Sequence, residues 1–214
     1  PGNLSSPLLA TAAVAGAAAA VATRSVRLNS ADSANFSRTP SSASNRRTFT
    51  WAGWYKPSVS GGSFRRLFGS GDTYLIHAGT GGINSKDSFY TNLRGGSTNY
   101  PVSYAPIFRD FSAWYHIVAI WDSTQATSSD RIKLYVNGVQ ETSLSAAVYP
   151  TQNYDSYVNQ SGELNQIGTY APASAPSFDG SMSHFHLIDG TAYAPTAFGS
   201  KDSTTGEWKI NTSP

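Results

Sequence analysis

The run WYHIVAIW at residues 114–121 constrains the fold of this chain more than any other stretch of its sequence. Successive side chains of a strand point to opposite faces, so the run divides into two sets. One set is Trp114, His116, Val118 and Ile120, and the other is Tyr115, Ile117, Ala119 and Trp121. Because both sets are largely apolar, both faces need a cover. The run therefore predicts a central strand between two layers.

The segment that follows predicts a hairpin beside this central strand. In RIKLYV, residues 131–136, the apolar Ile132, Leu134 and Val136 alternate with polar side chains, which is typical of a half-buried strand. Asn137-Gly138 comes next, and this dipeptide favours a two-residue turn in which both residues have positive φ. VQETSL, residues 139–144, would form the returning strand.

Other short runs bounded by turn residues predict further strands. They are 25–30, 47–57, 65–71, 73–79, 164–170 and 177–190, with 83–93 as a weaker candidate. Residues 98–112 contain Pro101 and Pro106, which predicts an edge strand or a loop because proline cannot donate a hydrogen bond to a sheet. We also expect one helical turn after Pro195 and loops over most of residues 146–176.

In the last of these runs, alternation assigns Phe185 and Leu187 to one face. The opposite face would hold Met182, His184, His186 and Ile188.

The composition favours a single all-β domain. Among 214 residues only 13% are charged, whereas Gly, Ser, Thr, Asn and Tyr are plentiful. No cysteine is present, which excludes a disulfide framework, a thiol nucleophile and a cysteine-ligated zinc site. A net charge of +2 from scattered basic residues gives no reason to expect nucleic-acid binding. Closely spaced turns predict an antiparallel two-sheet sandwich, and spacing alone leaves an immunoglobulin-like fold and a jelly roll open.

Residues 1–24 differ from the rest, because they contain the uncharged Ala-rich stretch LLATAAVAGAAAAVAT. A docking arm, a disordered terminus and a targeting segment are the competing interpretations. A signal peptide would have a basic region before its apolar stretch, and none is present here. The stretch is also short and only weakly apolar for a membrane span. A start at Pro1 also fits removal of an initiator Met.

An isolated Ala-rich helix of this length is marginal in water. We therefore expect the segment to become ordered on a partner surface or on trimer mates, without membrane insertion. The expected organisation is an N-terminal arm at residues 1–24 and a sandwich domain at residues 25–214.

Four segments resemble a known family: residues 25–40, 47–56, 108–140 and 178–209. They are similar to the laminin G-like jelly-roll domains of the concanavalin A-like superfamily. The closest likeness is to the versions in virion proteins of tailed bacteriophages, marine ones especially. WYHIV and IKLYVNG are shared across the broad superfamily, whereas FDGSMSHFHLIDGTAYAPTAFG is more typical of the phage proteins.

The resemblance implies an antiparallel jelly roll with a non-enzymatic role on the surface of a virion. Its partners would be other virion proteins, in the capsid or the tail, reached through residues 1–24. The lack of a long shaft favours a capsid decoration or head fibre over a complete tail fibre. A homotrimer and host surface glycans are further candidate partners, and a lectin-like module outside a virion is the alternative. The chain ends at Pro214, where many relatives continue into another strand.

Glycoside hydrolysis is the enzymatic alternative, and it needs two carboxyl groups about 5–10 Å apart. Enzymes that resemble this fold carry them on a Glu-x-Asp-x-(x)-Glu strand. Here Glu141, Glu163 and Glu207 are far apart, and none has an acidic residue two or four positions away. No G-x-S-x-G elbow is present either. We therefore predict no catalytic residue and no enzyme.

No metal or other cofactor is predicted, although two patterns contain residue types that bind metals. His184 and His186 have a spacing that metal ligands use, but a solvated polar strand face is the commoner arrangement. Calcium is an occasional cofactor of the family, and it requires several oxygen ligands. The weak candidates for it are Asp72, Asp87, Asp155 and Asp179.

Ligand binding is the remaining possibility, and it points to tyrosine-rich loops. Tyr side chains give contact area at low entropy cost, and Asn and Asp add hydrogen bonds. One loop would supply Asn153, Tyr154, Asp155, Tyr157, Asn159 and Tyr170, and another would supply Tyr100 and Tyr104. By contrast, Trp51, Trp54, Trp114 and Trp121 lie in apolar strands and are expected in the core.

Overall fold

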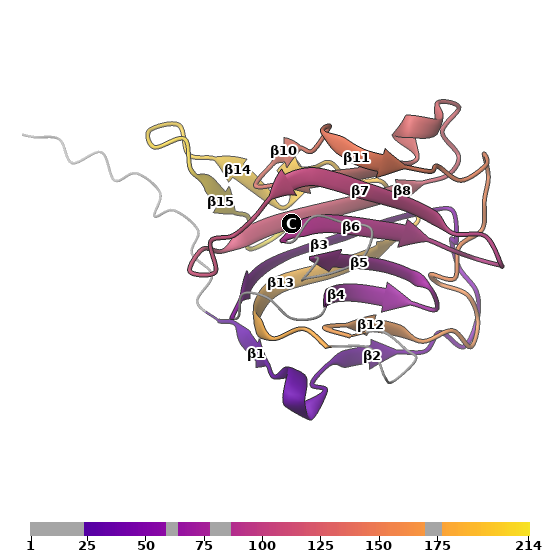
Figure 1. Cartoon of the computed structure of the whole chain (residues 1–214), viewed down its shortest axis with the longest axis horizontal. Helices are drawn as coiled ribbons and strands as arrows, with labels where there is room; N and C mark the ends of the chain where they lie inside the picture. Colours follow the sequence, from indigo (N-terminus) through magenta and orange to yellow (C-terminus); the bar gives the residue numbers. More distant parts are fainter. Residues whose placement is uncertain (1–23, 59–63, 78–86, 170–176) are drawn as a thin grey trace, which may run out of the picture.

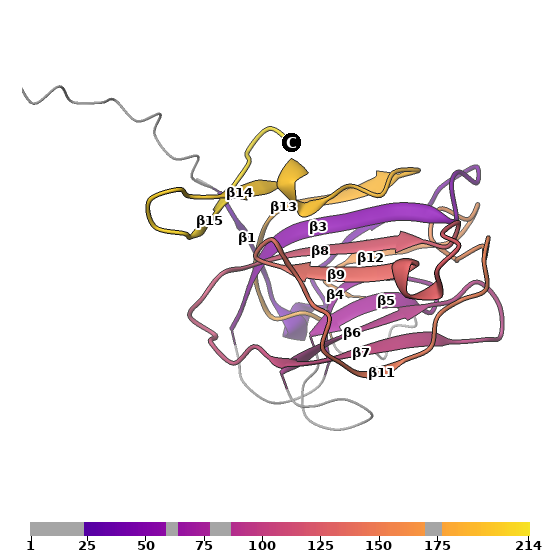
Figure 2. The same ribbon diagram turned by 90° about the horizontal axis from the view of Figure 1, so that it is seen from above.

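Two antiparallel β-sheets packed face to face form the body of the molecule in a computed structural model (Figures 1 and 2). The structure describes residues 24–58, 64–77, 87–169 and 177–214. One sheet has six strands in the order β1-β13-β3-β8-β9-β10, and the other has seven in the order β11-β7-β6-β5-β4-β12-β2. The expected all-β antiparallel sandwich is confirmed.

The strands have the following bounds. The six-stranded sheet contains β1 (Val26–Leu28), β3 (Thr48–Pro57), β8 (Tyr115–Asp122), β9 (Ile132–Val136), β10 (Val139–Gln140) and β13 (Gly180–Asp189). The seven-stranded sheet contains β2 (Phe36–Arg38), β4 (Arg65–Ser70), β5 (Thr73–His77), β6 (Ser88–Leu93), β7 (Tyr100–Ile107), β11 (Leu144–Ala147) and β12 (Asn165–Ile167). A separate hairpin pairs β14 (Gly199–Lys201) with β15 (Trp208–Ile210), and short 3-10 turns are η1 (Ser30–Asp32), η2 (Ser128–Asp130) and η3 (Pro195–Ala197).

Aromatic side chains dominate the core between the sheets. Trp121 of β8 stacks on Phe49 of β3 with 5.0 Å between ring centroids, and it meets Phe68 of β4 across the sandwich at 6.4 Å. Trp51 and Tyr55 of β3 are fully buried in the same cluster. Burial of such large side chains is the main driving force for joining the two sheets.

Every residue of β8 is buried, as the two apolar faces of its sequence predict. Its inward face, Tyr115, Ile117, Ala119 and Trp121, belongs to the core between the sheets. On the outward face, Val118 and Ile120 form a second, smaller core with Ala52 of β3 and Phe198. The C-terminal segment, from η3 to β15, supplies this outer cover (Figure 2).

Trp208 of β15 fixes the C-terminal segment to the six-stranded sheet. Its Nε1–H donates to Nδ1 of His116 at 3.0 Å, and the two rings stack at 5.9 Å. Trp208 also covers the turn at Asn137-Gly138, where a Cβ on Gly138 would lie 2.2 Å from the indole ring. Asn137 and Gly138 have φ of 48° and 78°, which confirms the predicted turn.

The expectation of an edge strand or a loop at residues 98–112 is wrong. β7 pairs with β6 on one side and with the short edge strand β11 on the other. The carbonyl of Pro101 still accepts a hydrogen bond from Val148 at 2.8 Å, because proline lacks only the donor. Pro106 lies in a bulge opposite β6, between the pairs Ser88–Ile107 and Tyr90–Ser103, where a missing N–H costs no regular ladder bond.

The face assignment of Met182 is also wrong. The β13–β3 register shifts between Ser183 and His186, and His184 has a φ of 45°. This bulge reverses the alternation, so Met182 lies in the main core together with Phe185 and Leu187.

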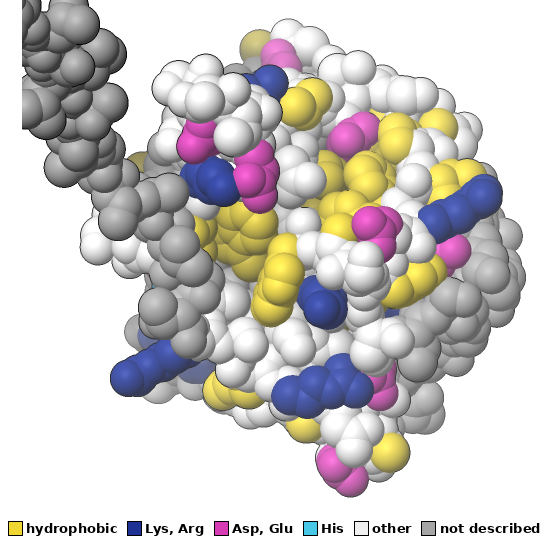
Figure 3. Space-filling view, turned by 90° about the vertical axis from the view of Figure 1, so that its left-hand side faces the viewer, with side chains coloured by type: hydrophobic (Ala, Val, Ile, Leu, Met, Phe, Trp, Pro, Cys, Tyr) yellow, Lys and Arg dark blue, Asp and Glu magenta, His cyan; other side chains and the backbone are white. Residues whose placement is uncertain are grey.

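The tryptophan expectations hold for some positions only. Trp51 and Trp121 are fully buried, and Trp54 is half-buried beside His116. Trp114 is 36% exposed, because it precedes β8 at the end of the sandwich. Figure 3 views this end, where the β7–β8 loop and the β14–β15 hairpin lie, and shows hydrophobic side chains gathered on it. Ile107, 42% exposed, ends β7 there.

The buried histidines predict a loss of stability in mild acid. Burial and the neighbouring His186 lower the pKa of His116 from 6.5 to about 3, and burial and Arg65 lower that of His77 to about 4. Between the folded-state pKa values and 6.5, the unfolded chain therefore binds more protons than the folded chain. The free energy of unfolding consequently falls as the pH falls below 6.5. Each histidine should reduce the free energy of unfolding by about 2 kcal/mol between pH 7.5 and 5.

Urea denaturation across this pH range measures the effect in the wild type and in His116→Gln. The variant should be less stable at pH 7.5, since it disturbs the contact with Trp208, but it should show a shallower decline with pH. The same decline in both proteins would contradict the assignment to His116. Carboxyl groups interfere little, because most of them titrate at lower pH.

Candidate functional site

Three tyrosines, Tyr100, Tyr154 and Tyr157, gather at the end of the sandwich where β6 ends and β7 begins, and we call them the tyrosine rim. The rings of Tyr100 and Tyr154 meet edge to face, with centroids 4.8 Å apart. The Tyr154 hydroxyl accepts a hydrogen bond from the Gly95 N–H at 2.8 Å, and the Tyr157 hydroxyl donates to the Gly96 carbonyl at 3.4 Å. All three residues are half-buried, so part of each ring remains accessible.

The rim depends on a close approach between two loops. Residues 94–99 connect β6 to β7, and a second segment, residues 148–164, packs directly against them. The Tyr157 N–H donates to the Arg94 carbonyl at 2.7 Å. A Cβ on Gly95 would lie 1.8 Å from the Asp155 carbonyl oxygen, so only glycine fits there.

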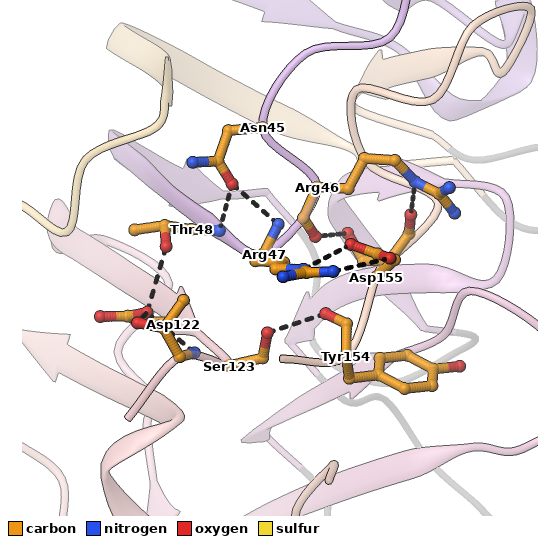
Figure 4. A network of polar contacts seen from close by, with 10 residues as sticks. Asn45, Arg46, Arg47, Thr48, Asp122, Ser123, Tyr154 and Asp155 are labelled. Atoms are coloured by element: carbon orange, nitrogen blue, oxygen red, sulfur yellow. Dashed lines mark hydrogen bonds and ion pairs between the residues drawn. The ribbon is translucent and has the colours of Figure 1, made fainter. Parts of the chain in front are cut away.

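A polar network behind the rim fixes the backbone of residues 153–156 (Figure 4). The Arg47 guanidinium pairs with the Asp155 carboxylate at 2.8 Å, and this contact lowers the pKa of Asp155. The Ser123 hydroxyl donates to the Tyr154 carbonyl at 2.7 Å, and Arg46 Nε donates to the Ser156 carbonyl at 2.7 Å. The ring of Tyr154 points away from this network in the same view. The segment is thus tied to the starts of β3 and of the β8–β9 loop.

The remaining residues predicted for ligand binding lie in different environments. Asn153 is exposed, with a φ of 61°, and its N–H donates to Ser123. Asn159 is 7% exposed, and its amide donates to the Asn45 carbonyl and the Asp189 carboxylate at 3.0 Å. Tyr104 is 2% exposed in the core, away from the rim. Tyr170 lies outside the described residues.

Each of the four calcium candidates is paired with a different arginine. Arg94 pairs with Asp72, Arg65 pairs with Asp87 at 3.3 Å, Arg47 pairs with Asp155 at 2.8 Å, and Arg27 pairs with Asp179 at 2.7 Å. The four carboxylates therefore belong to separate ion pairs. Across residues 24–58, 64–77, 87–169 and 177–214, no three His, Asp or Glu side chains are grouped as a metal site.

His184 and His186 do not act as a matched pair on one strand face. They lie in and beside the β13 bulge, so their ring environments differ. The His184 Nδ1 is 2.7 Å from the Ser183 hydroxyl, whereas the ring of His186 stacks on Phe198 at 5.8 Å. Within the described part of the chain, no helix has the length and apolar character needed to span a membrane.

The tyrosine rim combines the groups that bind a flat polar ligand. Accessible aromatic edges provide apolar contact, and the Tyr157 hydroxyl and the Gly96 carbonyl provide hydrogen-bonding groups beside them. The sequence indicated the tyrosines but not Gly95 and Gly96, which hold two of their hydroxyls. Their signal in the sequence is the RGGS stretch at residues 94–97, which by itself indicates only a turn.

The family model of the "Concanavalin A-like lectin/glucanases superfamily" matches residues 28–196. The chain belongs to this superfamily. A comparison with curated proteins finds no match.

Two solved structures illustrate the shared fold of this concanavalin A-like domain. A heptameric SAP-like pentraxin from Limulus polyphemus is 17% identical with a TM-score of 0.50, and the match covers 72% of this chain and 68% of that one. A candidate carbohydrate-binding protein from Bacteroides ovatus is 16% identical with a TM-score of 0.50, covering 82% of this chain and 54% of the other. At these identities the similarity shows the fold alone.

Substitution of two neighbouring glycines tests how closely the two loops of this concanavalin A-like domain pack. Gly95→Ala should destabilise the chain by about 1–3 kcal/mol, because the new Cβ collides with the backbone at Asp155. For a chain of this size each kcal/mol lowers the melting temperature by about 2–4 °C. Gly96→Ala is the matched control, since the nearest atom to its Cβ is the Tyr154 hydroxyl at 4.0 Å. Thermal unfolding should separate the two variants, and equal melting temperatures would contradict the close packing.

Proposed function

We propose that this chain is a non-catalytic carbohydrate-binding domain, displayed on the surface of a bacteriophage particle through residues 1–24. The tyrosine rim is the observation that carries the binding function. It presents half-exposed aromatic rings on a backbone held by Arg47, Ser123 and Gly95. Such a preorganised surface loses little conformational entropy on binding a glycan.

Membership of the concanavalin A-like superfamily supports carbohydrate binding, since that superfamily contains lectins. The virion setting is supported by the resemblance of residues 178–209 to phage proteins, together with the distinct Ala-rich start. A host surface glycan is the ligand that best fits both carbohydrate binding and display on a virion. A lectin-like module outside a virion is the alternative, and it shares the same binding surface.

The non-catalytic part of the proposal rests on how the carboxyl groups are used. Glu163 and Glu207 lie in different loops, and Glu207 pairs with Lys209 at 2.5 Å. Asp130 and Glu141 do line one pocket, but Asp130 is held by Lys133 at 2.9 Å. The hydrolase alternative therefore predicts polysaccharide cleavage that Glu141→Gln abolishes, whereas we expect no cleavage by the wild type.

Glycan-array binding tests the tyrosine rim. The wild type should bind a subset of glycans, and Tyr157→Ala should weaken that binding about tenfold or more, as for loss of a central aromatic contact. Tyr193→Ala is the control, because Tyr193 is 43% exposed but lies outside the rim. Circular dichroism verifies that each variant is folded. Unchanged binding by folded Tyr157→Ala would reject the rim as the site.

Deletion of residues 1–24 tests display on a particle. The truncated chain should remain folded and keep its glycan binding, because Tyr100, Tyr154 and Tyr157 all lie outside the deleted segment. Its incorporation into phage particles, measured by mass spectrometry of purified virions, should fall at least about tenfold. Incorporation at the wild-type level would reject the docking role of the arm while leaving carbohydrate binding intact.

A further inference from the structure

A pocket lies on the side of the sandwich, where the edge strands of the two sheets face each other. Its volume is about 230 Å³. The lining residues are Val102, Tyr104, Ser129, Asp130, Ile132, Lys133, Gln140, Glu141, Thr142, Leu144 and Tyr149. They come from β7 in one sheet, from β9 and β10 in the other, and from η2, β11 and the segments beside them.

The link from β10 to β11 closes the pocket. The Glu141 N–H donates to the Leu134 carbonyl in β9 at 2.9 Å, and the Ala105 N–H in β7 donates to the Ser143 carbonyl at 2.9 Å. The link is thereby tied to both sheets, and the pocket wall it forms is ordered. β11 continues with an irregular register between Leu144 and Ala146, which leaves Leu144 37% exposed at the opening.

The inner end of the pocket carries an unused hydrogen-bonding group. Tyr104 is 2% exposed, and its hydroxyl has no hydrogen-bond partner among the described residues. Burial raises the pKa of this phenol, the nearby Thr91 hydroxyl lowers it in part, and Tyr149 and Glu141 raise it further. Tyr104, Tyr149 and Glu141 all line the pocket. A buried hydroxyl without a partner is unfavourable, and a hydrogen bond from a ligand hydroxyl would remove this cost.

The charges of the pocket favour a neutral ligand. The Asp130 carboxylate and the Lys133 ammonium offset each other at 2.9 Å. Burial raises the pKa of Glu141, whose carboxyl group forms no hydrogen bond or ion pair with any described residue. An anionic ligand would be repelled by the two carboxyl groups, whereas the hydroxyl groups of a neutral ligand can donate hydrogen bonds to them.

We propose that this side pocket binds one neutral sugar ring. The ring hydroxyls would donate to Asp130 and Glu141 and would exchange a hydrogen bond with Tyr104, while Ile132, Leu144 and the ring of Tyr149 contact the apolar face. A volume below the usual range of ligand pockets suits a single ring better than an oligosaccharide. The side pocket and the tyrosine rim are separate sites that would bind the same class of ligand. A negative result for one site therefore leaves the proposal for the other unchanged.

Chemical-shift mapping on the full, isotope-labelled chain tests the pocket. The probes are glucose, galactose, mannose and N-acetylglucosamine, with glucuronic acid as the anionic comparison. At least one neutral sugar should shift the amide signals of Lys133, Glu141 and Thr142 at millimolar concentration. Glucuronic acid should bind at least about tenfold more weakly. The proposal would be overturned if none of the neutral sugars shifted these amide signals at concentrations up to about 100 mM. A dissociation constant above that value would mean that the pocket is not a binding site.

Tyr104→Phe separates a binding role from a structural one. It removes the hydroxyl without changing the shape of the core, so the free protein should be equally stable or more stable. Its affinity for the sugar should nevertheless fall about fivefold or more. Tyr193→Phe is the matched control outside the pocket and should alter neither property. Wild-type affinity in Tyr104→Phe would contradict the proposal.

Thr142→Trp provides a second variant at an exposed lining position, where the fold tolerates change. The indole should fill the opening and abolish sugar binding in the pocket. Tyr157→Ala, in contrast, should leave the pocket shifts unchanged. Loss of the pocket shifts in Tyr157→Ala together with their persistence in Thr142→Trp would assign the sugar to the tyrosine rim and overturn the second site.

Discussion

Burial of β8 on both of its faces is the constraint on which the rest of the structure depends. Its inward side chains require the seven-stranded sheet, and Trp121 meets Phe68 across the interface. Its outward side chains require a second cover, which the C-terminal segment provides through Phe198 and Trp208. The segment from η3 to β15 is therefore an integral part of the domain, even though its hairpin pairs with neither main sheet.

The same strand positions both candidate sites. At one end of β8, Ser123 binds the carbonyl of Tyr154 and so fixes the segment that carries the tyrosine rim. Along its side, β8 pairs with β9, and the β9–β10 hairpin forms one wall of the side pocket. Both sites thus lie on backbone that the core holds in place. The Tyr104 hydroxyl, which has no hydrogen-bond partner among the described residues, belongs to a residue that lines the side pocket.

Arginine–aspartate pairs tie the loops to the sandwich. Arg27 joins the first strand to Asp179 before β13, and Arg47 joins the start of β3 to Asp155 of the rim segment. Arg65 and Asp87, which are 4% and 3% exposed, form a buried pair beside His77. Breaking a pair this deeply buried leaves an uncompensated charge, which is far more costly than the loss of an exposed pair. With so few charged residues in the chain, these carboxylates are used for loop attachment and are poorly placed to bind a cation.

The sequence by itself determined the strands of the six-stranded sheet, the central position of β8 and the Asn137-Gly138 turn, because side-chain alternation and positive φ are local properties. It indicated the tyrosines of the rim but not their meeting, since Tyr100 and Tyr154 are distant in the chain and converge only when two loops pack. It misplaced Met182, because a bulge at His184 reverses the alternation and depends on pairing with β3. The side pocket could not be predicted from the sequence, since Tyr104 lies in β7 of one sheet and Glu141 follows β10 of the other. Only the tertiary structure decides which residues line this pocket, because the pocket forms where the edge strands of the two sheets lie side by side.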